Sequence, residues 1–448
     1  MSIKPQNAKG TRDFGPLETQ RRNFIFDTVK KHFSAHGFVP IETPAVENID
    51  VLTGKYGEEG DRLLFKILNS GDYLKKANEQ ELVSKDIKSL TKKISDRGLR
   101  YDLTVPFARF VAKNRNDLSF PFKRYQIQPV WRADRPQKGR FREFFQCDAD
   151  VVGSESLMYE AELVKIYDEV FSRLNVNAEI KVNNRKVLFG LAEAAGIEGQ
   201  FMDMTMAIDK IDKIGEEGVI KEMSDRGISK ESADQVLSNL TIDNLDDLEK
   251  AFVNSPTGLK GIEELRKLHS YLDRTETKNQ ISFDISLARG LTYYTGCILE
   301  VVSKDVKIGS IGGGGRYADL TSTFGLKGVS GVGISFGAAR IFDVMEELNL
   351  FPENIDQNLK VLLVAFDDDT HAHAFEVLSQ LRAQNIPSDL YPSPTKLKKQ
   401  MKYANDMNVP YVILIGSEEK KSGKLTLKNM VTGEQSNLSI VDIIESLS

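Results

Sequence analysis

Residues 120–152 alternate apolar and charged positions on both sides of the segment RADRPQKGR. Because side chains on a strand point to alternate faces, this pattern predicts two antiparallel strands joined by a long mobile loop. On the second strand an aromatic ring, an amide and two acids share one face: Phe144, Gln146, Asp148 and Asp150. Such a row fits the solvated face of an antiparallel sheet, or better a surface that holds a ligand with an ammonium group and a ring N–H. The hairpin therefore predicts an antiparallel sheet with one polar face.

Strand-like and helical segments succeed one another along the rest of the chain. Apolar spacing predicts helices at 17–36 and 156–173, and EIKVNN then predicts a strand. From about Lys186 to Lys278 the sequence is helical, acidic and lysine-rich, which predicts an inserted helical subdomain. Strand character resumes at ISFDISLA and ends in GVGISFGAARIFDVMEEL, a strand that runs into a helix.

The C-terminal part of the chain predicts a separate unit. LFPENIDQN is polar and contains proline, which is typical of a linker. Strands alternate with helices after it, which favours an α/β unit with a parallel-type sheet. The predicted boundaries are a first domain at 1–185 and 279–350, a helical insertion at 186–278, a linker at 351–358 and a second domain at 359–448.

Composition excludes several classes of protein. The chain has 448 residues, which suggests two or three domains, and it shows no signal peptide or membrane anchor. Two cysteines, Cys147 and Cys297, cannot form a disulfide framework, which fits a reducing cytosol. The net charge of −5 argues against nonspecific coating of nucleic acid. The lysine-rich segment TKLKKQMKY could still contact nucleic acid or form a solvated helix face.

Several arginines are candidate phosphate ligands. Arg132 ends the first strand of the hairpin, and Arg140 and Arg142 lie across the loop. They are either surface arginines of an edge hairpin or a clamp that binds phosphate oxygens bidentately. Arg340 lies where GVGISFG meets a helix, as either a buried structural arginine or a second phosphate ligand.

Two glycine-containing segments could border a ligand pocket. In LARGLTYYTG, Arg289 precedes Tyr293 and Tyr294, and the tyrosines serve either packing or a pocket. Residues 312–320 read GGGGRYADL, which forms either a floppy turn or a place where a bulky ligand approaches the backbone. The run matches neither a dinucleotide-binding loop nor a Walker loop. His32 and His36 form an i,i+4 pair, but no HExxH motif or acidic third ligand accompanies them, so the five histidines are expected to be structural or exposed.

Taken together, these segments resemble a known family. KGTRDFGP, LRYDLTVPFARF, RADRPQKGRFREFFQCDAD, SLARGLTYYTG, GGGGRYADL and GVGISFGAAR occur in the order and approximate spacing of histidyl-tRNA synthetases. The resemblance implies an α+β catalytic domain with an antiparallel sheet of class II synthetase type, a helical insertion and a C-terminal α/β anticodon-binding domain. It implies a cytoplasmic homodimer, with the interface around Pro44, that acts as an ATP-dependent histidine–tRNA ligase.

The resemblance also implies roles for individual residues. Asp102, Thr104 and Gln146 would hold the substrate ammonium, and Asp150, Tyr293 and Tyr294 would form the imidazole site. Arg132 would bind the ATP α-phosphate, Arg140 and Arg340 the γ-phosphate, Phe144 would stack on adenine, and Asp134 stands where the ATP-binding motif usually has Glu. Arg289 would stabilise charge at the reacting carboxylate and α-phosphate, with Mg²⁺ on the outgoing pyrophosphate and no protein metal site. Arg135, Gln137 and Lys138 would contact the tRNA for histidine.

Three positions depart from the family pattern, and two other functions compete. Thr292, Ala318 and Ala339 stand where an acid is usual, which puts the orientation of neighbouring side chains in doubt. One alternative is the non-catalytic, histidine-binding regulatory paralogue of ATP phosphoribosyltransferase, which usually lacks the anticodon domain. The other is a class II synthetase for a different amino acid, which the segment ARGLTYY opposes.

Overall fold

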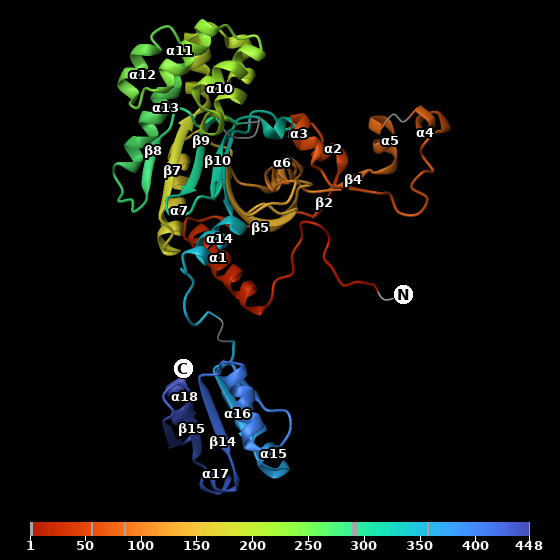
Figure 1. The fold of residues 1–448 in the computed structure, drawn as a ribbon, viewed down its shortest axis with the longest axis vertical. Helices are drawn as coiled ribbons and strands as arrows, with labels where there is room; N and C mark the ends of the chain where they lie inside the picture. The colour runs from red at the N-terminus through yellow and green to blue at the C-terminus, as the bar shows by residue number, and fades with distance from the viewer. Residues whose placement is uncertain (1–2, 55–56, 85–86, 289–293, 356–357, 448) are drawn as a thin grey trace. The chain divides into compact units, whose positions relative to one another are not determined.

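The chain forms two compact units, Met1–Phe351 and Pro352–Ser448, in a computed structural model. Figure 1 traces the chain through both units. The structure describes residues 3–54, 57–84, 87–288, 294–355 and 358–447. No helix in these ranges is long and apolar enough to cross a membrane.

An eight-stranded sheet forms the centre of the first unit, in the order β1-β5-β6-β11-β10-β9-β7-β8. The inner strands pair antiparallel, and each edge strand, β1 or β8, pairs parallel with its neighbour. The strands are β1 (Val39–Pro40), β5 (Phe122–Trp131), β6 (Glu143–Val152), β7 (Ala178–Asn184), β8 (Gln280–Phe283), β9 (Tyr294–Ser303), β10 (Gly312–Tyr317) and β11 (Gly331–Gly337). The antiparallel hairpin expected at residues 120–152 is β5 and β6, and the sheet grows on both sides of it.

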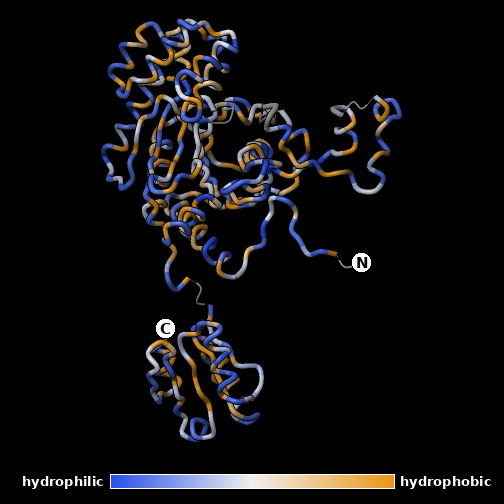
Figure 2. Tube along the Cα trace, in the orientation of Figure 1, coloured by the Kyte–Doolittle hydropathy of each residue, from blue (hydrophilic) through white to orange (hydrophobic). Residues whose placement is uncertain are grey.

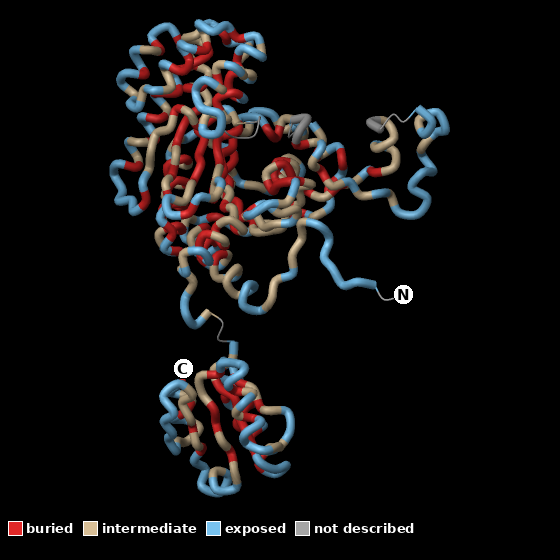
Figure 3. The backbone as a smooth tube through the Cα atoms, in the orientation of Figure 1, coloured by how far each residue is buried: buried red, intermediate tan, exposed pale blue. Residues whose placement is uncertain are grey.

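One face of this sheet is covered by helices and the other carries polar side chains. Helices α1 (Pro16–Ala35), α7 (Met158–Arg173) and α14 (Ala338–Glu347) pack on the first face. Phe33, Tyr167 and Phe336 meet there, with ring centroids 4.7 to 5.8 Å apart in the pairs Phe33–Phe336 and Tyr167–Phe336. Figure 3 shows that the strands of the large sheet are largely buried. Aromatic packing on one face leaves the alternate side chains of β6 for the other face.

The four glycines 312–315 lie in strand β10, and three of them face close neighbours. A methyl group on Gly312 would lie 2.7 Å from the ring of Tyr167, and one on Gly314 would lie 2.3 Å from the carbonyl oxygen of Gly333. A methyl group on Gly313 would meet nothing closer than 3.6 Å, because this glycine faces the polar side of the sheet. The run is therefore a strand that needs room on both faces, and the alternative of a floppy turn is wrong.

A smaller sheet and an arm extend the first unit beside α6 (Thr104–Lys113). The small sheet has the order β2-β4-β3, and the arm carries α4 and α5, which project from the sheets in Figure 1. The elements here are β2 (Val46–Asn48), α2 (Ile49–Leu52), α3 (Gly57–Arg62), β3 (Lys66–Ile67), α4 (Glu79–Ser84), α5 (Ile87–Ile94), β4 (Arg97–Leu99) and the 3-10 helices Arg115–Asp117 and Leu320–Phe324. No pattern in the sequence analysis indicated this arm.

The residues between β7 and β8 are helical. The helices are α8 (Arg185–Ala194), α9 (Phe201–Ile208), α10 (Ile211–Asp225), α11 (Lys230–Leu240), α12 (Leu245–Ala251) and α13 (Pro256–Leu272), with a 3-10 turn at Glu198–Gln200. Helices α8 and α13 approach closely at glycines, since a methyl group on Gly190 would lie 2.7 Å from Cα of Gly258. Their apolar side chains join the core of the large sheet, so the inserted helices belong to the same compact unit.

The second unit contains a five-stranded mixed sheet in the order β13-β12-β14-β15-β16. Figure 2 shows the hydrophobic central strands β12 and β14. The strands β12 (Val361–Ala365), β13 (Ser388–Leu390) and β14 (Tyr411–Ile415) are parallel, whereas β15 (Leu425–Asn429) and β16 (Gln435–Leu438) add an antiparallel hairpin. The helices are α15 (Asp368–Ala383), α16 (Leu397–Asp406), α17 (Ser417–Ser422) and α18 (Ile440–Leu447). The expected parallel-type sheet is therefore corrected to a mixed one, because a hairpin needs no crossover helix.

Candidate active site

A pocket opens on the polar face of the large sheet. Strand β6 provides its floor through Gln146, Asp148 and Asp150, as the period-two spacing predicted. Other elements complete the wall: Asp102 and Thr104 at the start of α6, Arg132 after β5, Tyr294 on β9, Gly313 and Tyr317 on β10, and Gly333, Ile334 and Ser335 on β11. We call this cavity the acidic pocket, because three carboxyl groups line it.

Asp150 lies at the closed end of the acidic pocket and is 2% exposed. Its Oδ1 accepts a 2.8 Å hydrogen bond from the hydroxyl of Tyr317, and its Oδ2 lies 2.7 Å from Nη2 of Arg124. Burial raises the pKa of Asp150, and the Arg124 guanidinium and the Tyr317 hydrogen bond both oppose that rise. The carboxyl group is thus held by a cation and a donor in a setting that otherwise favours its neutral form.

Asp148 is buried to the same degree as Asp150. Burial is the main cause that raises the pKa of Asp148 to about 7, while Arg124 lowers it and Asp150 raises it. Its Oδ1 has no hydrogen-bond partner among the described residues. Oε1 of Gln146 is likewise buried with no partner there, while its Nε2 donates to Oγ of Ser335 at 3.0 Å. Two buried acceptors without donors are costly, and a ligand ammonium group would supply donors.

Two further side chains of the acidic pocket are fixed by local structure. Asp102 is 1% exposed, and its Oδ1 accepts a 3.1 Å hydrogen bond from the backbone N–H of Val105, which ties it to the first turn of α6. Tyr294 begins β9, and its ring would be 3.0 Å from a methyl group on Gly315. Burial, followed by the three carboxyl groups, raises the pKa of Tyr294, so its hydroxyl remains a hydrogen-bond donor.

A second pocket adjoins the first and is rich in guanidinium groups. It shares Arg132, Gln146, Gly313 and Ser335 with the acidic pocket. Its remaining wall consists of Asp134, Gly139, Arg140, Phe141, Phe144, Ser310, Gly312, Gly337, Ala339 and Arg340. We call it the arginine pocket. The shared residues show that the two pockets adjoin.

The three arginines of this pocket are held in different ways. Arg132 donates from Nε to the carbonyl oxygen of Tyr101 at 3.1 Å and lies over the Tyr101 and Phe144 rings, 4.3 and 5.2 Å from their centroids. Arg340 donates from Nη1 to the carbonyl oxygen of Ser310 at 2.6 Å. Arg140 is half-exposed, and its Nη2 is 3.4 Å from Oδ1 of Asp134. Arg132 is therefore preorganised, whereas Arg140 can turn towards an incoming anion.

The connection between β5 and β6 covers residues 132–142 and contains a tight turn. Gln137 and Arg140 exchange backbone hydrogen bonds of 3.1 and 2.9 Å, and Gly139 between them has a φ of +68°. Arg135, Gln137 and Lys138 are exposed, and Nζ of Lys138 lies 2.9 Å from Oε2 of Glu347. The turn presents polar side chains outward next to the arginine pocket.

Some residues singled out in the sequence analysis lie elsewhere. Arg289, Thr292 and Tyr293 are outside the described residues. Ala318 is exposed and does not line either pocket, whereas Ala339 lines the arginine pocket. The departure from an acid at 318 thus concerns an exposed residue that follows Tyr317 but lines neither pocket.

The sequence analysis missed residues that complete the acidic pocket. Tyr317 and Ser335 belong to it, and Arg124 lies directly behind Asp150. Tyr317 lies two residues after the four glycines on β10. Arg124 is paired with Asp150 in the register of β5 and β6. The hairpin register could have identified Arg124, because a cation opposite an acid on the same face is a cross-strand pair.

Comparisons with known proteins agree on one family. A family model described as histidyl-tRNA synthetase matches residues 72–341, and one described as an anticodon binding domain matches residues 360–448. The chain belongs to the histidyl-tRNA synthetase family. A histidine–tRNA ligase of Christiangramia forsetii is 54% identical over 446 residues, and one of Phocaeicola vulgatus is 51% identical over 441 residues. These alignments cover 98% and 97% of this chain, and the same shares of the two relatives.

Solved structures of histidyl-tRNA synthetases have the same fold as this chain. The crystal structure of histidyl-tRNA synthetase from Nostoc sp. has a TM-score of 0.84 and 30% identity, and the match covers 100% of this chain and 99% of that one. An apo histidyl-tRNA synthetase from S. aureus has a TM-score of 0.70 at 20% identity over 99% of this chain and 100% of that one, and shows the fold alone. As in the family, the chain combines a catalytic unit built on a large sheet with an anticodon-binding unit that has its own sheet.

Proposed function

We propose that this chain is a histidine–tRNA ligase, which activates histidine with ATP and transfers it to the 3′ end of its tRNA. The observation that carries the proposal is the pairing of two adjoining pockets, one lined by three carboxyl groups and one by three guanidinium groups. An amino acid with an ammonium group and a ring N–H suits the first pocket, and a triphosphate suits the second. Gln146 and Arg132 border both, where the reacting carboxylate and α-phosphate would meet.

The acidic pocket would bind histidine by both of its polar ends. Asp102, Thr104 and Gln146 would accept the ammonium group, near the shared boundary of the two pockets. Asp150 would accept the imidazole N–H, and the Tyr294 hydroxyl would donate to the second ring nitrogen. Tyr293 is assigned to the same site from sequence alone. A site built to pair both ring nitrogens rejects analogues that leave its groups unpaired, by roughly 10⁴-fold.

The arginine pocket would bind ATP and stabilise the charge that develops during attack. One carboxylate oxygen of histidine forms a bond to the α-phosphorus, the bond to the β-phosphate oxygen breaks, and pyrophosphate leaves with the electron pair. Arg132 would bind the α-phosphate, Arg140 and Arg340 the γ-phosphate, and Phe144 would stack on adenine. Arg289 is assigned to the reacting carboxylate and α-phosphate from sequence alone. Preorganised cations of this kind contribute on the order of 3–4 kcal/mol each to the transition state.

Magnesium would enter with ATP. The described residues contain no group of three or more His, Cys, Asp or Glu side chains that could hold a metal ion. Asp134 is the carboxylate of the arginine pocket, and one carboxylate together with substrate phosphates is a common magnesium environment. Bound to the phosphates, the ion would neutralise charge on the leaving pyrophosphate.

The tRNA would be bound by two parts of the chain. The exposed turn with Arg135, Gln137 and Lys138 would contact the acceptor end, and the second unit would bind the anticodon stem. We further infer a cytoplasmic homodimer, with the interface around Pro44, as in the family. The regulatory paralogue of ATP phosphoribosyltransferase is disfavoured, because the arginine pocket is intact and a C-terminal unit matches the anticodon binding domain.

An ATP–pyrophosphate exchange assay with a panel of amino acids tests the proposal. Purified full-length protein with magnesium should exchange pyrophosphate with histidine and with no other common amino acid. Histidine binding without exchange would support the regulatory paralogue instead. Exchange with a different amino acid would show that the acidic pocket has been assigned to the wrong substrate.

A further inference from the structure

Arg124 is a fully buried arginine behind the acidic pocket. It lies on β5 directly opposite Asp150 on β6, and its side chain is 0% exposed. Nη2 lies 2.7 Å from Oδ2 of Asp150 and 3.5 Å from the carbonyl oxygen of Leu103. The guanidinium carbon is 4.2 Å from the ring centroid of Phe107 on α6. The cation is thus fixed between an aromatic ring and the carboxylate assigned to imidazole.

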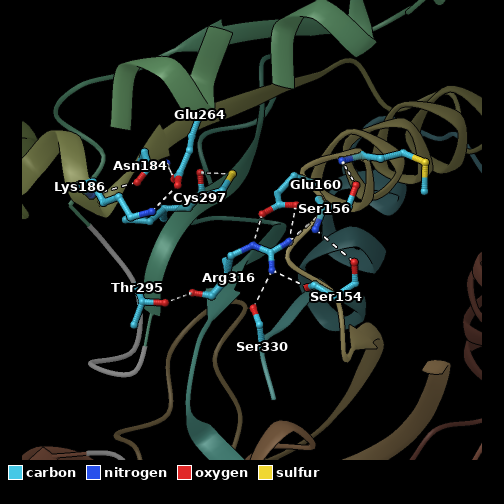
Figure 4. A network of polar contacts seen from close by, with 12 residues as sticks. Ser154, Ser156, Glu160, Asn184, Lys186, Glu264, Thr295, Cys297, Arg316 and Ser330 are labelled. Atoms are coloured by element: carbon cyan, nitrogen blue, oxygen red, sulfur yellow. Dashed lines mark hydrogen bonds and ion pairs between the residues drawn. The ribbon is translucent and has the colours of Figure 1, made fainter. Parts of the chain in front are cut away.

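The surroundings of Arg124 differ from those of a buried arginine with a structural role. Arg316 on β10 has an ion pair with Glu160, a 2.8 Å hydrogen bond to Oγ of Ser330 and a 2.9 Å hydrogen bond to the carbonyl oxygen of Ser154. Figure 4 shows these contacts around the Arg316 guanidinium. Nε and Nη1 of Arg124, in contrast, have no acceptor among the described residues. Hydrogen bonds within the fold therefore do not account for the burial of Arg124, as they do for Arg316.

A buried guanidinium whose N–H donors are unpaired lowers the stability of the fold. Its presence is explained if the charge acts on a neighbouring group. Removing charges from water is expensive, and buried ion pairs are often no better for stability than apolar replacements of similar volume. The acids that interact electrostatically with this charge are Asp150 and Asp148 on β6, and the neutral Tyr317 on β10 interacts with it as well. Arg124 thus pairs with the carboxylate that is assigned to the imidazole ring.

We propose that Arg124 is a specificity-determining positioning residue, which keeps the Asp150 carboxylate charged and oriented to accept the imidazole N–H of histidine. This inference rests on the proposed function. Arg124 contacts Oδ2 of Asp150 from the neighbouring strand β5, and Tyr317 fixes the other oxygen. A carboxylate has about four acceptor positions, so Asp150 can still accept from a ligand. Without the cation, the buried acid would take up a proton and become a donor itself.

The test replaces Arg124 by methionine, which keeps a long apolar side chain and removes the charge. In full-length Arg124→Met, histidine affinity measured by calorimetry should fall about 100-fold at neutral pH, the order expected for loss of a hydrogen bond to a charged group. ATP affinity should stay within twofold of the wild-type value. The acid limb of the histidine affinity profile should move to higher pH, because Arg124 lowers the pKa of Asp150. Arg124→Lys keeps the positive charge, so it should recover part of the histidine affinity and show a smaller shift of the acid limb.

A ring analogue provides a second readout. Thienylalanine has a ring of similar size with no N–H, so it cannot use the Asp150 carboxylate. The ratio of histidine to thienylalanine affinity should shrink in Arg124→Met, and a purely structural defect would weaken both ligands equally. Lys123→Met is the matched control, since Lys123 is the next residue on β5 and pairs with Glu162 on the opposite face of the sheet at 2.6 Å. It should leave the ratio unchanged.

Three outcomes would overturn the proposal. The first is histidine affinity within threefold of wild type in Arg124→Met, and the second is an equal loss at every pH and for both ligands. The third is a loss of the same size in Lys123→Met. Thermal unfolding shows whether Arg124→Met is folded. If it does not fold, the acid limb of histidine affinity in Arg124→Lys must lie at higher pH than in wild type for the proposal to stand. Absence of histidine exchange by the wild-type protein would instead refute the proposed function.

Discussion

The hydroxyl of Tyr317 on β10 bonds Oδ1 of Asp150 on β6 at 2.8 Å, although β11 lies between the two strands. Gly333 of β11 makes this contact possible. A methyl group on Gly333 would lie 2.0 Å from Oδ1 of Asp150, so any other residue would displace the carboxylate. Gly331 has the same relation to the Tyr317 ring, at 2.3 Å. Two glycines on the middle strand therefore let an acid and a phenol meet across it.

Tyr317→Phe should weaken histidine binding about tenfold or more, because a hydrogen bond to a charged group contributes about 1.5–3 kcal/mol. The loss should grow at low pH, since the Tyr317 hydrogen bond lowers the pKa of Asp150 and its removal lets the acid take up a proton earlier. Exchange kinetics at several pH values would measure both effects. Tyr159→Phe on α7, behind the sheet, is the control and should change neither the histidine nor the ATP constant. Unchanged histidine KM in Tyr317→Phe would contradict this role.

Local patterns predicted the part of the site that one strand supplies. Gln146, Asp148 and Asp150 share a face because strand geometry has a period of two, and no knowledge of the rest of the fold is needed. Tyr317 and Ser335 could not be assigned in the same way. Their place beside Asp150 depends on the strand order β6-β11-β10, which joins segments far apart in the sequence. Pairing between distant strands is set by the tertiary fold rather than by local propensity.

Arg289→Ala should lower the rate of histidine activation by about two to three orders of magnitude, as for other lost transition-state donors. Histidine affinity should change much less, because the proposed contact forms with charge that develops during attack. Single-turnover formation of the adenylate, compared with calorimetric histidine binding, separates the two quantities. A loss of affinity as large as the loss of rate would make Arg289 a ground-state ligand.

Asp148→Asn should change how stability depends on pH. The pKa of Asp148 is raised to about 7 in the folded chain from 3.8, so the folded state binds the extra proton between these values. The stabilisation that comes from binding this proton is complete below about pH 4 and is lost as the pH rises through 7. The variant should therefore gain stability relative to wild type as pH rises from 4 to 7, by at most about 1.4 kcal/mol per pH unit. The gain should level off above pH 7.

Thermal unfolding of both proteins from pH 5 to pH 8 would measure this effect. The exposed residue Asp117 lies on a 3-10 turn, and Asp117→Asn is the control that should follow the wild-type curve at every pH. A constant offset between Asp148→Asn and wild type would show that Asp148 does not exchange a proton in this range.

Deletion of residues 352–448 should leave pyrophosphate exchange largely intact and severely reduce tRNA charging. The two pockets lie wholly within Met1–Phe351, and each unit has its own hydrophobic core. Exchange and charging should be measured on the same truncated preparation, after its thermal unfolding shows a folded catalytic unit. Equal loss of both activities in a folded truncation would contradict the proposed division between chemistry and anticodon binding.

The same unit shows where sequence patterns were insufficient. The alternation of strands and helices predicted after the linker rests on short apolar runs such as VLLVA and YVILI, which form β12 and β14, because few alternatives bury four or five apolar residues in a row. Strand β15 has only two buried apolar residues, Leu425 and Leu427, and β16 is polar and exposed up to Leu438. They therefore carried no comparable signal, and the mixed sheet was missed. The arm with α4 and α5 was missed for a related reason. Leu82 and Val83 on α4 are exposed, so the apolar residues of this helix mark no buried face.

Gln137→Ala should narrow the difference in charging between tRNA with and without an extra guanine at its 5′ end. The segment ADRPQKG resembles the bacterial form of this loop in histidyl-tRNA synthetases, and the resemblance implies that the loop reads this guanine together with its partner base. In the structure Gln137 is exposed at a tight turn closed by backbone hydrogen bonds to Arg140, which also lines the arginine pocket. A side chain at this turn is free to reach a nucleotide next to the reacting end of the tRNA.

The alternative is that the turn only supplies positive charge to the phosphate backbone. An amide both donates and accepts, so Gln137 can discriminate base edges, whereas Lys138 and Arg135 would add sequence-independent attraction. Loss of one base contact should reduce discrimination by about 1–3 kcal/mol, and the rate with guanine-lacking tRNA should hardly change. Lys138→Ala is the matched control, because loss of a phosphate contact should slow both tRNAs alike. If Gln137→Ala also slows both tRNAs alike and leaves their ratio unchanged, the turn provides charge and not base recognition.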